Sequence, residues 1–146
     1  MIEKTFVPFH EIGNQEVIIV DGLHPRGLIL SHWKGGNIHT EITDDTSGGI
    51  VLNAIEKNIS GIDNPLISAT HFDIDGFVGV WALFEPQLAM QYKSVLHQMA
   101  VIGDFRELNL ANEGADHALK LVCYINAVEK VKFYVPFGEA DEIKLC

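Results

Sequence analysis

The sequence predicts an α/β protein with a mostly parallel sheet of about four to five strands and helices on both faces. Three observations lead to this prediction. Residues 17–20 are four β-branched residues in a row, which is typical of a strand buried on both faces in a parallel sheet. Short apolar segments alternate with longer segments whose apolar residues recur at helical spacing. Polar residues directly follow several of the short segments, as they do at the ligand-binding edge of open α/β sheets.

The first expected strands lie in the N-terminal third. Residues 6–10 are short and apolar, and Pro8 restricts them to an edge strand or an extended arm. Residues 16–22 form the clearest strand and end in an Asp-Gly pair. Residues 27–33 form another, followed by a glycine-rich turn.

A helix is expected next, opened by residues 43–49 and closed near residues 60–61. Its plausible N-caps are Asp45, Thr46 and Ser47. The pair Gly48-Gly49 would also let an anion approach the backbone N–H groups of the first turn. Ordinary capping is the favoured interpretation, because the spacing of a phosphate loop is absent.

The remaining elements follow a central polar motif. An apolar helix is expected over 77–84, and Pro86 is well placed to start another that runs to about Ala100. Residues 99–104 resemble a short buried segment that ends in an acid. A helix is expected over 115–130 and an extended or irregular segment over 131–136. Residues 139–146 resemble the opening turns of a helix, so we expect a single domain over 1–146 that is shortened relative to a longer relative, or a terminal stub that docks on it.

Composition limits the classes of partner. The chain has 146 residues and a net charge of −10, from 20 acidic and 10 basic residues. This balance argues against double-stranded nucleic acid and anionic membrane as partners, since both require basic patches. It allows a small phosphorylated or nucleotide substrate, because bound cations reverse the local charge of a site.

Other sequence features favour a cytoplasmic protein. The two cysteines, Cys123 and Cys146, do not make a disulfide framework. The first residues lack the order of a signal peptide, and no apolar run reaches the roughly 18–20 residues that span a bilayer. A reducing compartment fits these features best.

The central motif places His71, Asp73 and Asp75 at two-residue spacing. If this stretch is extended, the three side chains point to one face while Phe72 and Ile74 point into the core. Carboxylate oxygen and imidazole nitrogen together suit a divalent cation such as Mn²⁺, Mg²⁺ or Zn²⁺.

A purely structural interpretation stands beside this one. Either aspartate can cap the helix that follows, and the histidine can be a satisfied core residue. Capping accounts for one aspartate, but not for both together with the histidine.

Three further residues are candidate metal ligands because each follows an apolar segment. Asp21 ends the strand at 16–22, although an Asp-Gly turn explains it equally well. His32 ends the strand at 27–33, and Asp104 ends the segment at 99–104. Ligands bind outside the carboxyl ends of the strands in open α/β sheets, so these side chains are expected near the central motif.

Residues 70–76, Thr-His-Phe-Asp-Ile-Asp-Gly, resemble the first motif of the DHH phosphoesterases, a His/Asp-x-Asp-x-Asp-Gly signature at the end of a strand. They are most similar to an uncharacterised bacterial branch with His-Phe-Asp-x-Asp-Gly. The resemblance implies a parallel α/β fold and hydrolysis of phosphodiesters, pyrophosphates or short nucleotides with two Mn²⁺ or Mg²⁺ ions. It also implies that His71, Asp73 and Asp75 are metal ligands in the catalytic site.

The chain departs from that family in two respects. It lacks the Asp-His-His triplet, and the nearest match, Ser31-His32-Trp33, precedes the first motif instead of following it. The usual substrate-gripping second domain has no counterpart. These departures suggest a rearranged motif order in which Asp21 and His32 complete the site.

Three functions therefore remain open. The first is a metal-dependent phosphoesterase, and the second is a catalytically inactive module that binds metal or nucleotide. The third is a structural protein in which the central motif only caps helices.

Overall fold

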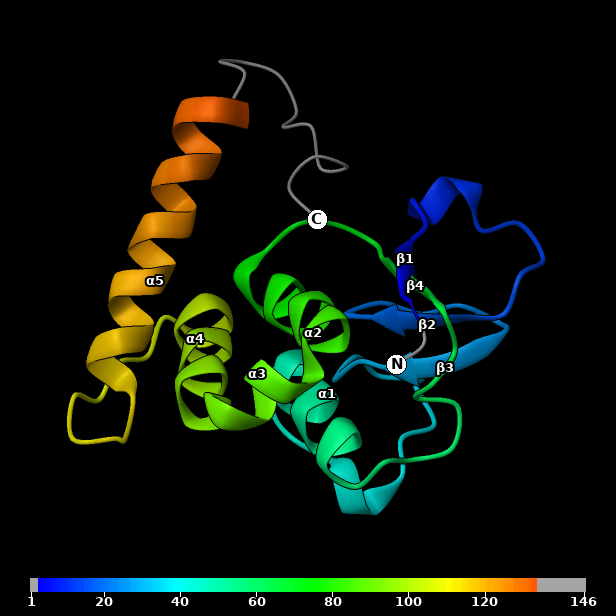
Figure 1. Cartoon of the computed structure of the whole chain (residues 1–146), viewed down its shortest axis with the longest axis horizontal. Coiled ribbons are helices and arrows are strands. Elements are labelled where there is room, and N and C mark those ends of the chain that lie inside the picture. The colour runs from blue at the N-terminus through cyan, green and yellow to red at the C-terminus, as the bar shows by residue number, and fades with distance from the viewer. Residues whose placement is uncertain (1–2, 134–146) are drawn as a thin grey trace.

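The computed structural model of the chain describes residues 3–133 (Figure 1). Its sheet has four strands in the order β1-β4-β2-β3, and every pairing is parallel. The strands are β1 (Thr5–Phe6), β2 (Val17–Val20), β3 (Gly27–Leu30) and β4 (Leu66–Ala69). The predicted α/β class and parallel sheet are confirmed, and the Pro8 segment contributes only a two-residue edge strand.

The helices described between residues 3 and 133 are mostly α-helical. They are α1 (Ser47–Glu56), α2 (Ile74–Phe84), α3 (Pro86–Gln91), α4 (Lys93–Phe105) and α5 (Ala115–Val128). Two 3-10 helices, η1 (Phe9–Glu11) and η2 (Thr40–Ile42), and a π-helical turn, η3 (Glu129–Phe133), complete the elements. None of these helices is long and apolar enough to cross a lipid bilayer.

The strand register brings three strand ends together. Val20 of β2 pairs with Leu30 of β3 on one side and with Ala69 of β4 on the other. Because all strands run parallel, the residues that follow these three positions emerge at the same edge of the sheet. This register places polar residues from three separate parts of the chain next to one another.

The two faces of the sheet are covered differently. Ile18, Val20 and Ile67 pack in the main core with residues of α1 and α2. On the opposite face Val17 and Ile19 form a small cluster with Ile12, which caps the end of η1. Within the described residues, the α-helices that contact the sheet therefore cover one face, and a short 3-10 connection covers the face where helices were also expected.

The C-terminal half differs from the prediction in its helix boundaries. The helix that starts at Pro86 ends at Gln91, and a new helix starts at Lys93 because the backbone of Tyr92 leaves the helical conformation. Residues 99–104, expected to be a short buried segment, belong to α4, whose apolar residues face α2 and α5 at helical spacing. Figure 1 shows α5 beyond α4, on the side away from the sheet.

The last predicted segments are only partly described. The helix expected over 115–130 is confirmed as α5, and its last turns continue as the π-helical η3. Part of the segment expected to be extended or irregular, 131–136, therefore adopts a helical turn. The expected helix opening at 139–146 lies outside the described residues.

Candidate metal centre

The polar residues at the carboxyl edge of the sheet converge on one location. Asp21 directly follows β2, His32 lies two residues after β3, and His71 lies two residues after β4. All three face the N-terminal turns of α1 and α2. The sheet edge therefore brings together the side chains that the sequence predicted from their positions after apolar segments.

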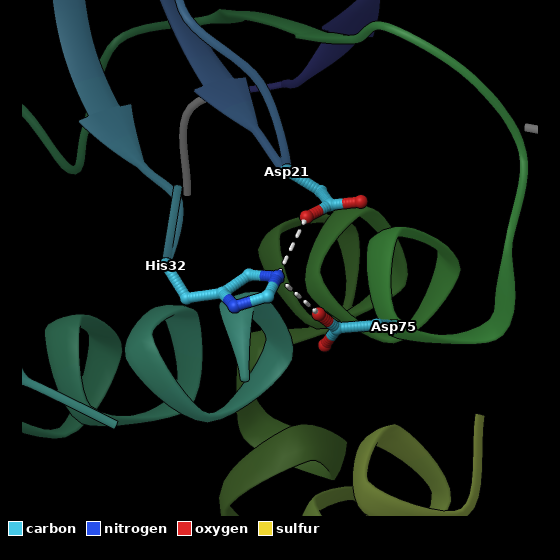
Figure 2. A group of neighbouring side chains, drawn as sticks. All are labelled: Asp21, His32 and Asp75. Atoms are coloured by element: carbon cyan, nitrogen blue, oxygen red, sulfur yellow. Dashed lines mark ion pairs between the residues drawn. The ribbon is translucent and has the colours of Figure 1, made fainter. Parts of the chain in front are cut away.

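Asp21, His32 and Asp75 form a first group of ligand atoms (Figure 2). His32 Nε2 lies 3.6 Å from Asp21 Oδ1 and 3.9 Å from Asp75 Oδ2. One ligand atom from each residue lies within 4.8 Å of the others. Both carboxylates are almost completely buried, with 2% and 1% of their residue surface exposed.

Asp21, His71 and Asp73 form a second group, which shares Asp21 with the first. His71 Nε2 lies 2.9 Å from Asp73 Oδ2 and 3.5 Å from Asp21 Oδ2. The two oxygens of Asp21 therefore face different histidines, since Oδ1 lies towards His32 and Oδ2 towards His71. A carboxylate in this position can bridge two cations.

The predicted extended conformation of the central motif is wrong, although its side chains do converge. Strand β4 ends at Ala69, and Asp73 is the N-cap of α2, where its Oδ1 accepts a 2.7 Å hydrogen bond from the Gly76 N–H. Asp75 lies in the first helical turn. Asp is a strong N-cap, so the helix starts inside the motif and ends the alternation of a strand. Capping and site formation coexist, because the free Oδ2 of Asp73 contacts His71.

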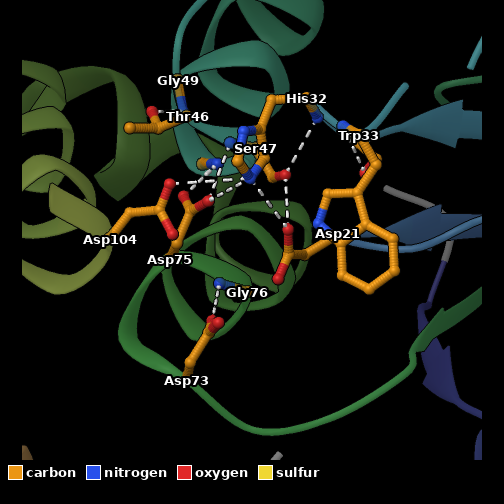
Figure 3. A network of polar contacts seen from close by, with 12 residues as sticks. Asp21, His32, Trp33, Thr46, Ser47, Gly49, Asp73, Asp75, Gly76 and Asp104 are labelled. Carbon is orange, nitrogen blue, oxygen red and sulfur yellow. Dashed lines mark hydrogen bonds and ion pairs between the residues drawn. The ribbon is translucent and has the colours of Figure 1, made fainter.

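Asp75 is held by the N-terminus of α1. Its Oδ2 accepts a 2.9 Å hydrogen bond from the Ser47 N–H, and its Oδ1 accepts a 2.6 Å bond from the Gly48 N–H (Figure 3). Thr46 is the N-cap of this helix and accepts from the Gly49 N–H. The first turn of α1 is thus saturated by protein groups, so the preferred capping interpretation holds and the anion interpretation does not.

Burial raises the pKa of Asp75 to about 7. The N–H groups of Gly48 and Ser47 oppose this shift, while the negative charges of Asp21 and Asp104 reinforce it. Burial also raises the pKa of Asp21, against a hydrogen bond from Ser47. A nearby cation stabilises the ionised form of clustered, buried carboxylates, so these pKa shifts fit a site that binds positive charge.

Asp21 has an unusual backbone as well as an unusual side chain. Its φ of 49° lies in the left-handed region, which Asp adopts more readily than most residues. The chain bends at Asp21 and Gly22, which is compatible with the local role that the Asp-Gly interpretation assigned to them. At this bend the two oxygens of Asp21 face the two histidines.

Thr70 fixes the proton of His71. The Thr70 hydroxyl donates its proton to the Asp21 carbonyl oxygen at 2.9 Å, so its oxygen can only accept from His71 Nδ1, also at 2.9 Å. Nδ1 therefore carries a proton, and Nε2 is the nitrogen that faces the carboxylates. A hydrogen bond at one ring nitrogen is the usual way in which proteins orient the other towards a metal.

Asp104 joins the site from an unexpected element. It lies in the last turn of α4 and not at a strand end, because residues 99–104 are helical. Its Oδ2 lies 3.6 Å from His32 Nε2. It belongs to neither three-residue ligand group, but it adds a fourth carboxylate beside them.

The structure also places an open cavity next to His32. Its volume is about 450 Å³, and its lining residues are His32, Asp44, Asp45, Phe105 and Glu107. Asp44 pairs with His97 of α4, whose Nε2 lies 3.0 Å from Asp44 Oδ2. The hydrogen bond to Asp44 raises the pKa of His97. Burial acts to raise the pKa of Asp44, but the same hydrogen bond acts to lower it, and the net shift is downward.

The chemistry of the candidate ligand atoms indicates which metal ions this site could hold. Buried carboxylate oxygens with imidazole nitrogens are typical ligands of Mn²⁺, Zn²⁺ and related ions, while Mg²⁺ prefers oxygen. Asp21, Asp73, Asp75 and Asp104 supply four carboxylates around two histidines. The charge of two divalent cations would balance them. The residues present can therefore hold a metal ion.

Fold and site together define an α/β protein with Asp/His groups able to hold a metal ion at the carboxyl edge of a parallel sheet. The chain belongs to the family described as DUF6687, a family of unknown function, whose model matches residues 2–146. No match was found among curated proteins or among solved structures. The likeness of residues 70–76 to the DHH phosphoesterases stays a prediction from the sequence.

Proposed function

We propose that this protein is a phosphoesterase-like hydrolase that uses two divalent cations, Mn²⁺ or Mg²⁺, on a phosphodiester or a small nucleotide. The observation that supports the proposal is the shared position of Asp21 in both ligand groups. A carboxylate with one oxygen towards each histidine would hold two cations close together. Closely spaced pairs of metal ions serve phosphoryl transfer by binding the attacking and the leaving oxygen.

The chain's own residues have distinct roles in this proposal. His32 and Asp75 would hold one cation, His71 and Asp73 the other, and Asp21 both. When bound, the cations would polarise the phosphoryl oxygens and lower the pKa of a water nucleophile. The cavity beside His32 offers space for the part of the substrate that does not react.

A second candidate function is metal binding without hydrolysis. One observation favours it, namely that the described residues lining the 450 Å³ cavity include neither Lys nor Arg. Lys and Arg usually stabilise the charge of a transferring phosphoryl group. Without them, the metal ions alone would have to hold the phosphate.

The decisive experiment measures metal content and hydrolysis on the same samples. The chain is loaded with Mn²⁺, desalted and analysed by elemental analysis, and its activity is followed with bis-p-nitrophenyl phosphate. We expect two Mn²⁺ per chain and turnover above that of free Mn²⁺. The Asp21→Asn variant, which keeps the shape of the side chain, should lose both metal ions and all activity. Asp116→Asn, an exposed change on α5, is the matched control and should retain both.

The outcomes separate the candidates. Two metal ions with turnover support the hydrolase, and metal binding with no turnover of diester, monoester or nucleotide supports the binding module. A wild-type chain that retains no metal above the Asp21→Asn variant contradicts both.

A further inference from the structure

Ser47 lies at the centre of the polar network in Figure 3, among the Asp and His residues of the two groups. It is the first residue of α1 and is completely buried. Its hydroxyl contacts Asp21 and the backbone of His32, and its own N–H contacts Asp75. One residue thus touches three of the candidate ligands, which come from three separate parts of the chain.

The direction of each hydrogen bond follows from its partners. The His32 N–H can only donate, so it fills an acceptor position of the Ser47 oxygen at 3.2 Å. The hydroxyl proton is then directed to Asp21 Oδ1, which lies 2.7 Å away. This bond occupies one lone pair of Oδ1 and leaves the other side of the oxygen towards His32.

The rotation of the Asp21 carboxylate determines whether both ligand groups exist. Its Oδ1 must face His32 while its Oδ2 faces His71, at 3.6 Å and 3.5 Å. The Ser47 hydroxyl donates a hydrogen bond to the Asp21 carboxylate. Within the described residues, this is the hydrogen bond that the carboxylate receives from outside the set of candidate ligands. Rotation of the side chain would remove one oxygen from one of the groups.

We propose that Ser47 is a positioning residue that holds the Asp21 carboxylate in its bridging orientation, so that two metal ions bind as a coupled pair. This inference rests on the proposed two-metal function. Hydrogen-bonding partners behind the ligands of metal sites commonly contribute 10–100-fold to metal affinity. The proposal adds a specific consequence, which is that loss of the hydroxyl should uncouple the two ions.

Thr46 provides a matched control at the same helix end. It is also buried, its hydroxyl oxygen accepts from the Gly49 N–H, and its O–H group donates to Asp44 Oδ1. Within the described part of the chain, its hydrogen bonds go to Asp44 and Gly49 and to none of the candidate ligands. Thr46→Ala and Ser47→Ala therefore each remove a buried hydroxyl from adjacent residues, the first together with a methyl group, and only the second removes a hydrogen bond to Asp21. In both variants the backbone N–H groups that hold Asp75 remain.

The experiment titrates the full chain with Mn²⁺ by calorimetry and records the electron paramagnetic resonance spectrum of the loaded protein. For wild type we expect two ions and the spectrum of an exchange-coupled pair. For Ser47→Ala we expect about 10–100-fold weaker binding of one ion and the six-line spectrum of isolated Mn²⁺. Thr46→Ala should lower the melting temperature but keep the wild-type affinity and the coupled spectrum. Ser47→Cys fills a similar space with a weaker donor and should shift affinity and spectrum in the direction of Ser47→Ala.

The experiment gives different results if the role of Ser47 is wrong and if the two-metal proposal is wrong. If wild type binds no pair of ions, the two-metal proposal is wrong. If wild type shows a coupled pair that persists in Ser47→Ala with unchanged affinity, the role of Ser47 is wrong and the two-metal proposal stands. If Ser47→Ala does not fold, Ser47→Cys decides by the same two measurements. Equal losses of affinity in Thr46→Ala and Ser47→Ala would also overturn the inference, because they would reflect a general loosening of α1.

Discussion

Raising the pH should destabilise the metal-free protein, and a divalent metal should reverse this loss. The physical reason lies in Asp75, whose burial raises its pKa to about 7 from the ordinary 3.8. The folded protein therefore binds a proton at Asp75 more tightly than the unfolded chain does. The resulting stabilisation is complete below pH 3.8 and disappears as the pH rises through 7.

The size of the effect follows from the shift. A displacement of about three pKa units corresponds to about 4 kcal/mol of unfolding free energy. About 3 kcal/mol of this should be lost between pH 5 and pH 8, because the unfolded carboxyl is already mostly ionised at pH 5. A cation held by Asp75 and Asp21 would replace the proton, so metal should stabilise the protein more at pH 8 than at pH 5.

The assay is urea unfolding at pH 5, 6, 7 and 8, in a chelator and in excess Mn²⁺. Asp75→Asn is expected to be less stable at pH 5, because an amide NH₂ would face one of the two N–H donors, but to show a flatter pH dependence. Asp116→Asn, at an exposed position on α5, should keep the wild-type profile.

Three results would refute this reasoning. In the first, the metal-free wild type keeps its unfolding free energy within about 1 kcal/mol from pH 5 to pH 8, against the expected loss of about 3 kcal/mol. In the second, the loss occurs equally in Asp75→Asn, which would assign it to other groups. A stabilisation by Mn²⁺ that is the same at both pH values would contradict competition between the cation and the proton.

Three further predictions concern the surroundings of the site. Thr70→Val removes the hydroxyl that accepts from His71 Nδ1, so Mn²⁺ affinity measured by calorimetry should fall about 10–100-fold at one ion only. Gly79→Ala should lower the free energy of unfolding in urea by about 1–3 kcal/mol, because the new Cβ would lie 2.6 Å from Val20 Cγ1 where α2 meets β2. An unchanged urea midpoint would contradict this packing. His97→Gln should destabilise the protein more at pH 6 than at pH 9, by at most about 1 kcal/mol for this partly exposed pair. The sign follows from the raised pKa of His97, since its stabilisation is present below the ordinary value of 6.5 and is lost as the pH rises through the folded value; equal losses at both pH values would refute it.

Local sequence signals predicted the fold class and the candidate ligands of the site. Four consecutive β-branched residues specify β2, and Pro86 at the start of α3 is favourable wherever the helix lies. Asp21 and His32 were recognisable because each follows an apolar strand segment, and chain direction alone then places it at the carboxyl edge. These signals act over a few residues and do not depend on what packs against them.

Other features depended on the tertiary structure. Asp104 was predicted at the end of a short buried segment and reaches His32 from the last turn of a helix, because so short an apolar segment has no period that separates strand from helix. Ser47 had only the signal of a possible N-cap, and nothing near it in the chain indicates that its hydroxyl faces Asp21, which lies 26 residues away.

By itself, the sequence determined that this is an acidic α/β protein with Asp and His residues at its strand ends, because backbone periodicity and capping are local properties. Only the tertiary structure decided that the two oxygens of the Asp21 carboxylate face two different histidines. That arrangement requires the strand order β1-β4-β2-β3, which places β2 between the strands that carry His32 and His71. Strand order is set by long-range packing of the helices on the sheet, and no short stretch of the chain encodes it.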